Sequence, residues 1–585
     1  MVDILFVNAT SNLDIREEVN GTMLLATKLM QAGFSTKILR FGQFESCNVD
    51  YSAFIKEISS EILNISPQCV SFYALWPQYH TMLRIASKVK ESRPDISIVF
   101  GGPQATATSR DTMEAMPFVD YVCTGEGEET VVPFFDAIFK QADLSHIPGL
   151  YYRKDGCVVC NDFLAPLCDL NDLPHWDERL YVDDYKKAGV SVDPNTLYMP
   201  IDAGRGCPYS CTFCCTSHFW RRTYRLKSAQ TIVNDILYYR NKYGIKSFWF
   251  SHDAFTVDKE LVSQVCDGIV AAGLNDISWK CTSRIDCITE DLINKMQQAG
   301  LKAIELGIET GSPRMQKLIN KNLNLEKANE IIEMLLKNKL HVGLFFMYGF
   351  PEETEDDLNK TLEMIFSLLD KGVQHVSMSF CRFNPKTAIT EKYFDDLVFD
   401  SQIQILLRTG FFGHDEEIEM IRENKALFPF FFHLDTPVRN GFQFLSAFVL
   451  LYQKLCKVMK RVRVYYQGDN LAFYKDFVRT NQHIFEQGYG QISKNLRFQF
   501  YEMVDNLICF LNVPETKQLR ALAEFEADCV KISTEKEDAL IRKTYNFSYI
   551  DFKLELPIKD FSDGKTEILL EKKNGKVDMK VLRIE

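Results

Sequence analysis

The sequence has 585 residues, with 67 basic and 79 acidic side chains and a net charge of −12. This length exceeds a single hydrophobic core, which stops growing at roughly 250–300 residues, so several domains are expected. The acidic balance disfavours a nucleic-acid partner, because affinity for nucleic acid rests mainly on neutralising phosphates. A basic group at Arg221, Arg222, Arg225 and Lys227 leaves a local groove open as an alternative to a solvated face.

Export and membrane segments are not expected. Residues 1–6 enter a strand-like run without the basic and apolar regions of a signal peptide. The longest apolar run, residues 442–452, is shorter than the ~20 residues of a membrane span. The 17 cysteines fit reduced thiols inside a cell. We therefore predict a cytoplasmic protein without a membrane partner.

Residues 1–145 alternate short β-rich runs with amphipathic helical patterns, which predicts a doubly wound, Rossmann-like α/β domain. The expected strands are 3–7, 35–39, 69–73, 96–100 and 121–123, and helices are expected at 22–32 and 79–92. Ligands of such folds bind over the carboxyl ends of the strands. The loops that follow these strands are therefore candidate binding loops.

Residues 146–195 are predicted to be a linker. It contains a hairpin pattern, GLYYRKDGCVVCND, and a connector rich in Asp and Pro, LCDLNDLPHWDE. Cys157, Cys160 and Cys168 leave a second metal site open, although the strand-like run around the first two favours a structural role.

Residues 196–395 form a second βα series, which predicts a parallel barrel or partial barrel. The expected strands are 247–251, 278–282, 303–307, 342–348 and 375–380, with helices at 260–272 and 325–338. Residues 396–585 are predicted to be mainly helical with a short β tail. Hairpin turns are expected there at Asp563-Gly564 and Asn574-Gly575.

The segment RGCPYSCTFCC, residues 205–215, places Cys207, Cys211 and Cys214 on one short loop after the first barrel strand. Three thiolates at the spacing C-x3-C-x2-C suit three irons of a cubane [4Fe-4S] cluster and leave the fourth iron without a protein ligand. A zinc site would require a second cysteine pair or histidines at ligand spacing, and His218 is the nearby candidate. The spacing therefore favours the iron–sulfur cluster.

These cysteines and Phe213 resemble the C-x3-C-x-aromatic-C signature of radical S-adenosylmethionine (SAM) enzymes. Later segments resemble successive strand ends of that family's partial (β/α)6 TIM-type barrel: FWFSHDAF at 248–255, WKCTSRID at 279–286, ELGIETGSP at 305–313 and FMYGFPEET at 346–354. The resemblance implies that SAM binds the open iron through its amino and carboxylate groups. It implies a SAM site formed by Phe213, Asp253, Arg284, Glu309, Ser312 and Gly349.

The implied SAM site leaves alternatives open. Arg284 and Glu309 also fit an ordinary ion pair of the barrel, and Gly349 also fits a turn after a strand. Cys215 and Cys281 are expected to be bystanders. No catalytic residue is assigned beyond the cluster loop.

Two N-terminal segments, IVFGGPQATATSRD at 98–111 and DYVCTGEGEET at 120–130, resemble the cobalamin-binding domain that precedes the radical domain in a large subclass of this family. The implied cobalamin-binding residues are Thr10, Ser11, Asn12, Tyr73, Ala74, Leu75, Trp76, Tyr79, Gly101, Gly102, Pro103, Gln104, Gly125, Glu126, Gly127, Glu128 and Thr130. The cobalt-binding histidine of the motif D-x-H-x-x-G is missing from the first loop, NATSNLD. Trp76 or Tyr79 is then expected to pack beneath the corrin.

The resemblance implies a cobalamin-dependent radical SAM enzyme with a [4Fe-4S] cluster, SAM and cobalamin as cofactors. The activity it favours is methyl transfer to an unactivated carbon of a natural product or peptide, through a 5′-deoxyadenosyl radical and methylcobalamin. An external electron donor such as flavodoxin or ferredoxin is expected, and residues 396–585 are expected to recognise the substrate. Radical oxidation, cyclisation or rearrangement without methyl transfer is one alternative, and a cobalamin-binding sensor with a structural cluster is another.

Overall fold

The computed structural model describes residues 2–10, 20–42, 51–73, 75–161, 167–180, 198–401, 415–485, 489–535, 538–547, 564–573 and 576–584. The chain divides into two units by its internal contacts. Unit 1 consists of Met1–Leu306, Ile319–Asn322 and Arg382–Asp435. Unit 2 consists of Gly307–Leu318, Leu323–Cys381 and Thr436–Glu585.

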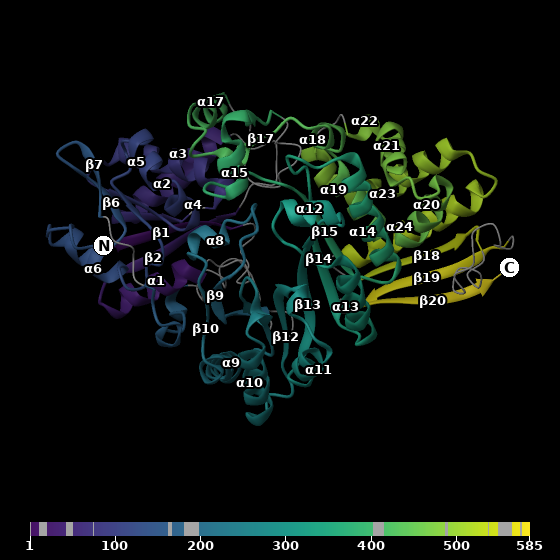
Figure 1. Ribbon diagram of the computed structural model, residues 1–585, viewed down its shortest axis with the longest axis horizontal. Coiled ribbons are helices and arrows are strands. Elements are labelled where there is room, and N and C mark those ends of the chain that lie inside the picture. The colour runs from purple at the N-terminus through teal and green to yellow at the C-terminus, as the bar shows by residue number, and fades with distance from the viewer. Residues whose placement is uncertain are drawn as a thin grey trace. The chain divides into compact units, whose positions relative to one another are not determined.

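The first part of unit 1, purple and blue in Figure 1, contains a seven-stranded sheet. Its strand order is β2-β1-β3-β4-β5-β6-β7. Its strands are β1 (Val2–Thr10), β2 (Thr36–Gly42), β3 (Pro67–Tyr73), β4 (Ser97–Gly101), β5 (Tyr121–Cys123), β6 (Leu150–Lys154) and β7 (Cys157–Cys160). The first five strands pair in parallel in the order 2-1-3-4-5, which is a doubly wound arrangement. This confirms the predicted fold of the N-terminal domain.

Helices connect these parallel strands: α1 (Asn20–Gln31), α2 (Tyr51–Ile65), α3 (Tyr79–Ser92), α4 (Pro103–Ala107), α5 (Ser109–Ala115) and α6 (Val131–Phe139). The central strands are apolar on both faces, as helices on both sides of a sheet require. Leu5, Val70 and Phe100 are fully buried, and the rings of Phe72 and Phe100 stack at 5.1 Å. Helix α3 has the bounds that its apolar periodicity predicts.

The predicted linker hairpin is present as the antiparallel pair β6–β7. Asp155 (φ 53°) and Gly156 (φ 79°) form its two-residue turn, which has the positive φ angles that match the twist of the strands. Cys157 and Cys160 lie three residues apart on β7, so their side chains point to opposite faces. Cys168 is buried elsewhere, beside Glu126. The three cysteines therefore do not converge on a second metal site.

The second sheet has six strands in the order β15-β14-β13-β12-β11-β8. Unit 1 contributes β8 (Tyr198–Asp202), β11 (Ser247–Ser251) and β12 (Ser278–Arg284), which pair in parallel. Their connecting helices are α9 (Ala229–Tyr243), α10 (Lys259–Ala271) and α11 (Glu290–Gln298). A two-stranded hairpin, β9 (Gly204–Gly206) with β10 (Tyr224–Leu226), and the short helix α8 (Thr216–Phe219) surround the cysteine loop.

Strand β13 (Leu301–Glu309) begins in unit 1 and ends in unit 2. Unit 2 continues the series with the parallel strands β14 (His341–Tyr348) and β15 (His375–Phe380). Its helices here are α12 (Pro313–Leu318), α13 (Leu325–Lys337) and α14 (Glu355–Asp370). The βα series confirms the predicted partial barrel fold.

The rest of unit 1 contains α15 (Ala388–Tyr393), β16 (Val398–Phe399), α17 (Asp415–Glu423) and β17 (Phe432–His433). The rest of unit 2 is mainly helical, with α18 (Pro437–Gly441), α19 (Leu445–Lys454), α20 (Cys456–Arg463), α21 (Asn470–Thr480), α22 (Gln482–Phe485), α23 (Tyr489–Leu511) and α24 (Thr516–Thr534). Phe366, Phe448 and Phe473 form an aromatic core between α14, α19 and α21. Among the described residues, no helix is long and apolar enough to cross a membrane.

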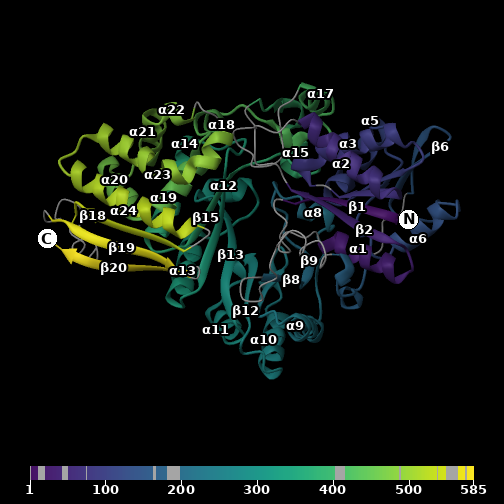
Figure 2. The ribbon, with the colours of Figure 1, turned by 180° about the vertical axis from the view of Figure 1, so that it is seen from behind.

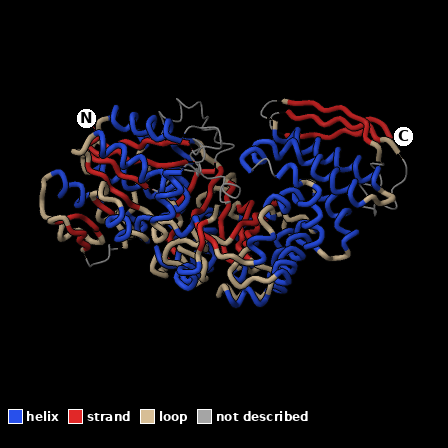
Figure 3. The backbone as a smooth tube through the Cα atoms, turned by 90° about the horizontal axis from the view of Figure 1, so that it is seen from above, coloured by secondary structure: helices blue, strands red, loops and turns tan. Residues whose placement is uncertain are grey.

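The tail is an antiparallel sheet of β18 (Ala539–Tyr545), β19 (Thr566–Lys573) and β20 (Lys576–Ile584) that packs on α24 (Figures 2 and 3). It confirms the predicted β tail. Asp563, Asn574 and Gly575 of the two expected turns lie outside the described residues. The expected domain boundaries at 145, 195 and 395 stay predictions.

Candidate cluster and cofactor site

Strand β9, which leads into the cysteine loop, contains two glycines at positions without room for a side chain. A Cβ atom on Gly204 would lie 2.3 Å from the carbonyl oxygen of Arg225, and one on Gly206 would lie 2.0 Å from that of Thr223. Gly206 also has a φ angle of +87°, which side chains disfavour. The close pairing of β9 with β10 therefore depends on glycine.

Backbone hydrogen bonds hold the middle of the cysteine loop. The N–H of Thr212 donates to the carbonyl of Ile319 at 3.0 Å, and the carbonyl of Thr212 accepts from Ile389 at 3.0 Å. The side-chain amide of Asn320 donates to the carbonyl of Ser210 at 3.0 Å. These contacts fix the loop from two segments that are distant in sequence.

Cys207, Cys211 and Cys214 are all half-buried on this loop. Burial raises the pKa of the Cys207 thiol to about 11, and the neighbouring groups Cys214, Asp253 and Cys211 add to this effect. Cys211 and Cys214 thus act electrostatically on the Cys207 thiol, and bound iron would stabilise the thiolate forms of the cysteines. Three adjoining cysteines on one fixed loop fit a [4Fe-4S] cluster with one iron left open.

Arg284, which the resemblance assigns to SAM, lies against the cysteine loop. Its Nε and Nη2 atoms donate to the carboxylate of Asp286 at 3.0 and 2.9 Å, and Nη2 also donates to the carbonyl of Lys321 at 2.9 Å. Its Nη1 atom lies 3.7 Å from the sulfur of Cys211. Burial alone would lower the pKa of Arg284, but Asp286 and Cys211 hold this pKa above its usual value.

The other predicted SAM residues of unit 1 lie beside the same loop. Asp253 remains accessible to solvent, yet many protein atoms surround its carboxylate. This partial desolvation raises the pKa of Asp253, and a hydrogen bond from the Gly206 backbone only partly offsets the rise. Phe213 is half-buried between Cys211 and Cys214 in the sequence. The structure therefore brings Phe213, Asp253 and Arg284 to the cluster loop, and their contacts with SAM stay predictions.

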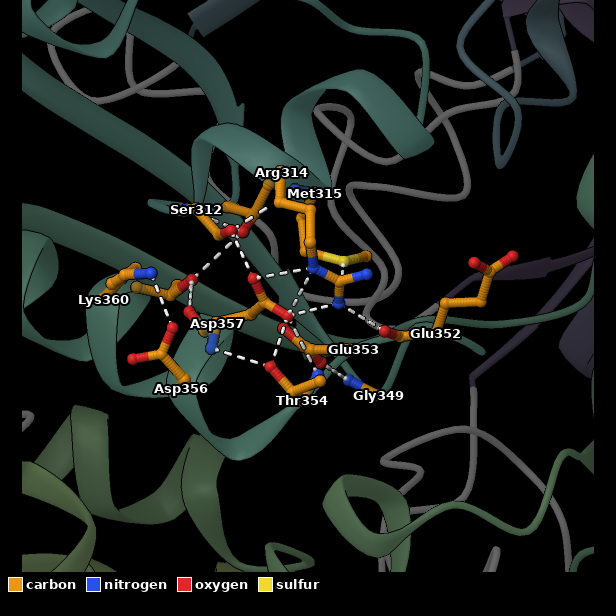
Figure 4. A network of polar contacts seen from close by, with 12 residues as sticks. Ser312, Arg314, Met315, Gly349, Glu352, Glu353, Thr354, Asp356, Asp357 and Lys360 are labelled. Atoms are coloured by element: carbon orange, nitrogen blue, oxygen red, sulfur yellow. Dashed lines mark hydrogen bonds and ion pairs between the residues drawn. The ribbon is translucent and has the colours of Figure 1, made fainter.

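The remaining predicted SAM residues, Glu309, Ser312 and Gly349, lie at the ends of strands in unit 2. Glu309 is buried and has a φ angle of +71°, which is unusual for a residue with a side chain. The Gly349 N–H donates to Glu353 Oε2 at 2.6 Å. Ser312 is fully buried, and its hydroxyl donates to Asp357 Oδ1 at 2.5 Å (Figure 4).

Asp357 is the centre of a polar network at the start of α14 (Figure 4). Arg314 donates to the Asp357 carboxylate, and Thr354 donates to Asp357 Oδ2 through its backbone at 3.0 Å and its hydroxyl at 2.6 Å. Burial alone would raise the pKa of Asp357, but the hydrogen bonds from Arg314, Ser312 and Thr354 hold it well below its usual range. In this arrangement the Ser312 hydroxyl supports the loop rather than facing a ligand.

The predicted cobalamin loops lie at the carboxyl ends of β3, β4 and β5. The backbone there stays half-exposed at Gly101, Gly102, Pro103 and Gly125, although the strands that lead to it are buried. Gly102 has a φ angle of +91°, and a Cβ atom on it would lie 2.7 Å from the ring of Tyr73. An open edge with close backbone approach fits a large planar ligand.

Several predicted cobalamin residues use their side chains within the protein. Tyr79 is fully buried, and its hydroxyl lies 2.7 Å from that of Thr112, which favours a core role over a contact beneath the corrin. Gln104 Nε2 donates to the carbonyl of Leu427 at 2.7 Å, and the Thr130 hydroxyl donates to that of Gly127 at 3.3 Å. Leu75 is exposed and Trp76 half-buried. Ser11, Asn12, Ala74 and the side chain of Thr10 lie outside the described residues.

Glu126 and Glu128 form a buried ionic network with two arginines that sequence reasoning did not assign to the site. Arg205 Nη2 lies 2.7 Å from Glu128 Oε1, and its Nη1 lies 3.3 Å from Glu126 Oε2. Arg225 donates to Glu126 and, at 2.9 Å, to the carbonyl of Cys168. The guanidinium of Arg205 also lies 5.6 Å from the centre of the Trp220 ring.

This network changes the interpretation of two sequence features. Two members of the basic group do not line a free groove, because Arg225 binds Glu126 and Lys227 binds Asp235 at 2.8 Å. Glu126, Glu128 and Cys168 are close enough to suggest a metal site, but the two arginines already neutralise the carboxylates. The one signal for Arg205 in the sequence is its place two residues before the cysteine Cys207.

Comparisons with known families match both halves of this arrangement. Residues 9–134 match the model of the B12 binding domain, and residues 201–365 match that of the radical SAM superfamily. An uncharacterised methyltransferase of Pyrococcus horikoshii is 31% identical over 317 residues, which are 54% of this chain and 66% of that protein. An anaerobic magnesium-protoporphyrin IX monomethyl ester cyclase of Rubrivivax gelatinosus is 25% identical over 320 residues, 53% of this chain and 56% of that protein. The chain thus spans about half to two-thirds of these relatives.

The fold is similar to a solved structure. The radical SAM methyltransferase TsrM of Kitasatospora setae, with cobalamin and a [4Fe-4S] cluster bound, superposes with a TM-score of 0.54 and 14% identity over 72% of this chain and 81% of that chain. The two family matches confirm the predicted cofactors, a [4Fe-4S] cluster, SAM and cobalamin. The chain belongs to the radical SAM superfamily and carries a B12-binding domain ahead of its radical SAM domain.

Proposed function

We propose that this protein is a cobalamin-dependent radical SAM methyltransferase that methylates an unactivated carbon of a natural product or peptide. One observation supports this most: within unit 1 the loops predicted for cobalamin adjoin the cluster loop. Tyr73, at the end of β3, has a pKa raised to about 12, mostly by burial. The nearby Cys215 thiol, beside the cluster cysteines, adds to this rise. Helix α4, after β4, contacts α8, after the cluster loop.

Such closeness suits chemistry that uses both cofactors on one substrate. When bound, the cluster and SAM supply a carbon-centred radical and cobalamin supplies a methyl group. The task of this chain is then to hold Cys207, Cys211 and Cys214 in place and to keep water away from the reacting carbon. The relatives named as methyltransferases, in Pyrococcus horikoshii and Kitasatospora setae, favour this outcome.

A second activity, radical oxidation or cyclisation without methyl transfer, is favoured by the similarity to the Rubrivivax gelatinosus cyclase. The two activities differ in their products. Methyl transfer converts SAM to both 5′-deoxyadenosine and S-adenosylhomocysteine, whereas a radical cyclisation forms 5′-deoxyadenosine alone. A sensor with a structural cluster would form neither.

The test is anaerobic reconstitution with iron, sulfide and cobalamin, followed by incubation with a chemical reductant and SAM that carries a deuterated methyl group. Candidate metabolites and peptides are screened by mass for a transferred labelled methyl group. Cys214→Ala should abolish 5′-deoxyadenosine formation, and the matched variant Cys215→Ala should retain it. Formation of 5′-deoxyadenosine without S-adenosylhomocysteine, with a dehydrogenated or rearranged product, would overturn methyl transfer.

We also propose flavodoxin or ferredoxin as the electron donor, and a cytoplasmic location. The donor follows from the need of such a cluster for an external low-potential electron. The location is supported by the 17 cysteines, which fit reduced thiols inside a cell. Replacing the chemical reductant by each reduced donor protein tests the first part.

A further inference from the structure

Arg284 is held against the cysteine loop by contacts on several sides. One edge of its guanidinium is bound by Asp286, and Nη2 is shared with the carbonyl of Lys321. The guanidinium carbon lies 3.7 Å from the centre of the Tyr209 ring, and Tyr209 belongs to the same loop as the cysteines. The Tyr209 hydroxyl is in turn 3.3 Å from the sulfur of Cys287.

These contacts aim the remaining edge of the guanidinium at sulfur. Nη1 lies 3.7 Å from Cys211 Sγ, within the range of an N–H···S hydrogen bond. The Arg284 side chain is only 8% exposed, whereas that of Asp286 on its other edge is 41% exposed. The positive end of the pair is therefore buried beside the cysteine, and the negative end is partly screened by solvent.

We propose that Arg284 is a positioning residue of the [4Fe-4S] cluster, which donates a hydrogen bond to the Cys211 sulfur and raises the reduction potential of the cluster. Reduction adds one electron, and therefore one negative charge, to the cluster. A buried cation and an N–H donor beside a ligand sulfur stabilise that added charge. Arg284 would thus ease electron entry before SAM is cleaved.

This inference rests on the cluster of the proposed function and not on methyl transfer. It also differs from a direct contact between Arg284 and SAM. A SAM contact affects SAM affinity and leaves the potential of the SAM-free cluster unchanged. The potential measured without SAM therefore separates the two roles.

The experiment is a potentiometric titration of the SAM-free, reconstituted protein, followed by electron paramagnetic resonance of the reduced cluster. Arg284→Gln removes the cation and leaves Asp286 uncompensated, so reduction should become about tenfold less favourable, a shift of about −59 mV. Asp286→Asn leaves the cation uncompensated and should shift the potential in the opposite direction, by a smaller amount because Asp286 is partly exposed. Arg240→Gln, which breaks the 2.9 Å pair with Asp276 on the barrel periphery, is the charge-matched control and should leave the potential unchanged.

Opposite shifts for Arg284→Gln and Asp286→Asn support the proposal, because damage to the loop would not give shifts of opposite sign. Potentials equal to the wild type in both variants would overturn it, and so would shifts in the same direction. If Arg284→Gln does not retain iron, the potentials of Arg284→Lys and Asp286→Asn test the proposal in its place. A potential for Asp286→Asn that is more positive than for the wild type supports the proposal, and an unchanged potential in both overturns it. If the two variants shift the potential in opposite directions as expected but the wild-type protein transfers no methyl group, the proposed function fails and the role of Arg284 stands.

Discussion

Arg205 and Glu128 form a buried ion pair with 2.7 Å between Nη2 and Oε1, although 76 residues separate them in the sequence. Their side chains are only 7% and 4% exposed. Glu128 belongs to the turn after β5 of the B12-binding domain, and Arg205 lies two residues before the first cluster cysteine. The pair therefore ties a loop predicted to bind cobalamin to the strand that leads into the cysteine loop.

Replacing Arg205 by Met should destabilise unit 1 strongly, because Glu126 and Glu128 would remain buried without a full counter-charge. The expected loss in the free energy of unfolding is about 3–5 kcal/mol, as for other broken buried pairs. Chemical denaturation followed by fluorescence measures this loss. Arg93→Gln breaks the exposed pair with Asp95 and should leave the free energy of unfolding almost unchanged, because solvent screens this pair. A loss in unfolding free energy for Arg205→Met as small as that for Arg93→Gln would show that the Arg205 network does not stabilise the unit.

Gly206→Ala should prevent the cysteine loop from holding its cluster. The new Cβ atom would lie 2.0 Å from the carbonyl oxygen of Thr223, and the φ angle of +87° disfavours any side chain. We expect β9 and β10 to separate and the iron and sulfide content after reconstitution to fall by more than half. Gly244→Ala is the control, since Gly244 also has a positive φ angle, +71°, but has no atom within 4 Å of the added Cβ. Full iron content in Gly206→Ala would contradict the steric argument.

The sequence predicted much of the fold because its local patterns are strong. Helix α3 combines an apolar face with Pro94 beyond its end, and β11 is a short run of aromatic residues that ends at a loop. The partners of Glu126 and Glu128 were not predictable, because a Gly-Glu repeat indicates a turn but not which distant arginine approaches it. The left-handed backbone of Glu309 was not predictable either, since local propensity assigns such angles to glycine or asparagine.

Ser312→Ala should lower stability without weakening SAM binding. Its buried hydroxyl donates to Asp357, and a hydrogen bond to a charged group contributes about 1.5–3 kcal/mol. Equilibrium dialysis with labelled SAM should give the wild-type Kd, and chemical denaturation should show the loss in unfolding free energy. A raised Kd with unchanged stability would instead assign Ser312 to the SAM site, as the family resemblance implies.

The stability of unit 2 should depend on pH through Glu353. Burial raises the pKa of this carboxyl to about 8 in the folded protein, from an ordinary value of 4.5. Between these values the folded state holds a proton that the unfolded state releases, so stability is greatest at the acidic end and is lost as the pH rises towards 8. The contribution should fall by about 1.4 kcal/mol per pH unit.

Glu353→Gln should remove this dependence, because the neutral amide can still accept the hydrogen bond from the Gly349 N–H. Unfolding free energies of wild type and variant are compared across this pH interval. Glu355→Gln, at an exposed position that pairs with Lys475, is the control and should leave the slope unchanged. A constant difference between wild type and Glu353→Gln at all pH values would refute the assignment.

Trp76 and Tyr79, the two alternatives for the residue beneath the corrin, should behave differently towards cobalamin. Tyr79→Phe removes a buried hydroxyl that pairs with Thr112 and should cost about 0.5–1.5 kcal/mol of stability. It should leave the cobalamin Kd unchanged, because the ring is fully covered by protein. Trp76 retains exposed surface in the connection that follows β3, so Trp76→Ala should raise the Kd about tenfold, or about 1.4 kcal/mol. Absorbance titration of the apoprotein with cobalamin measures both, and a raised Kd in Tyr79→Phe alone would reverse the assignment of the two residues.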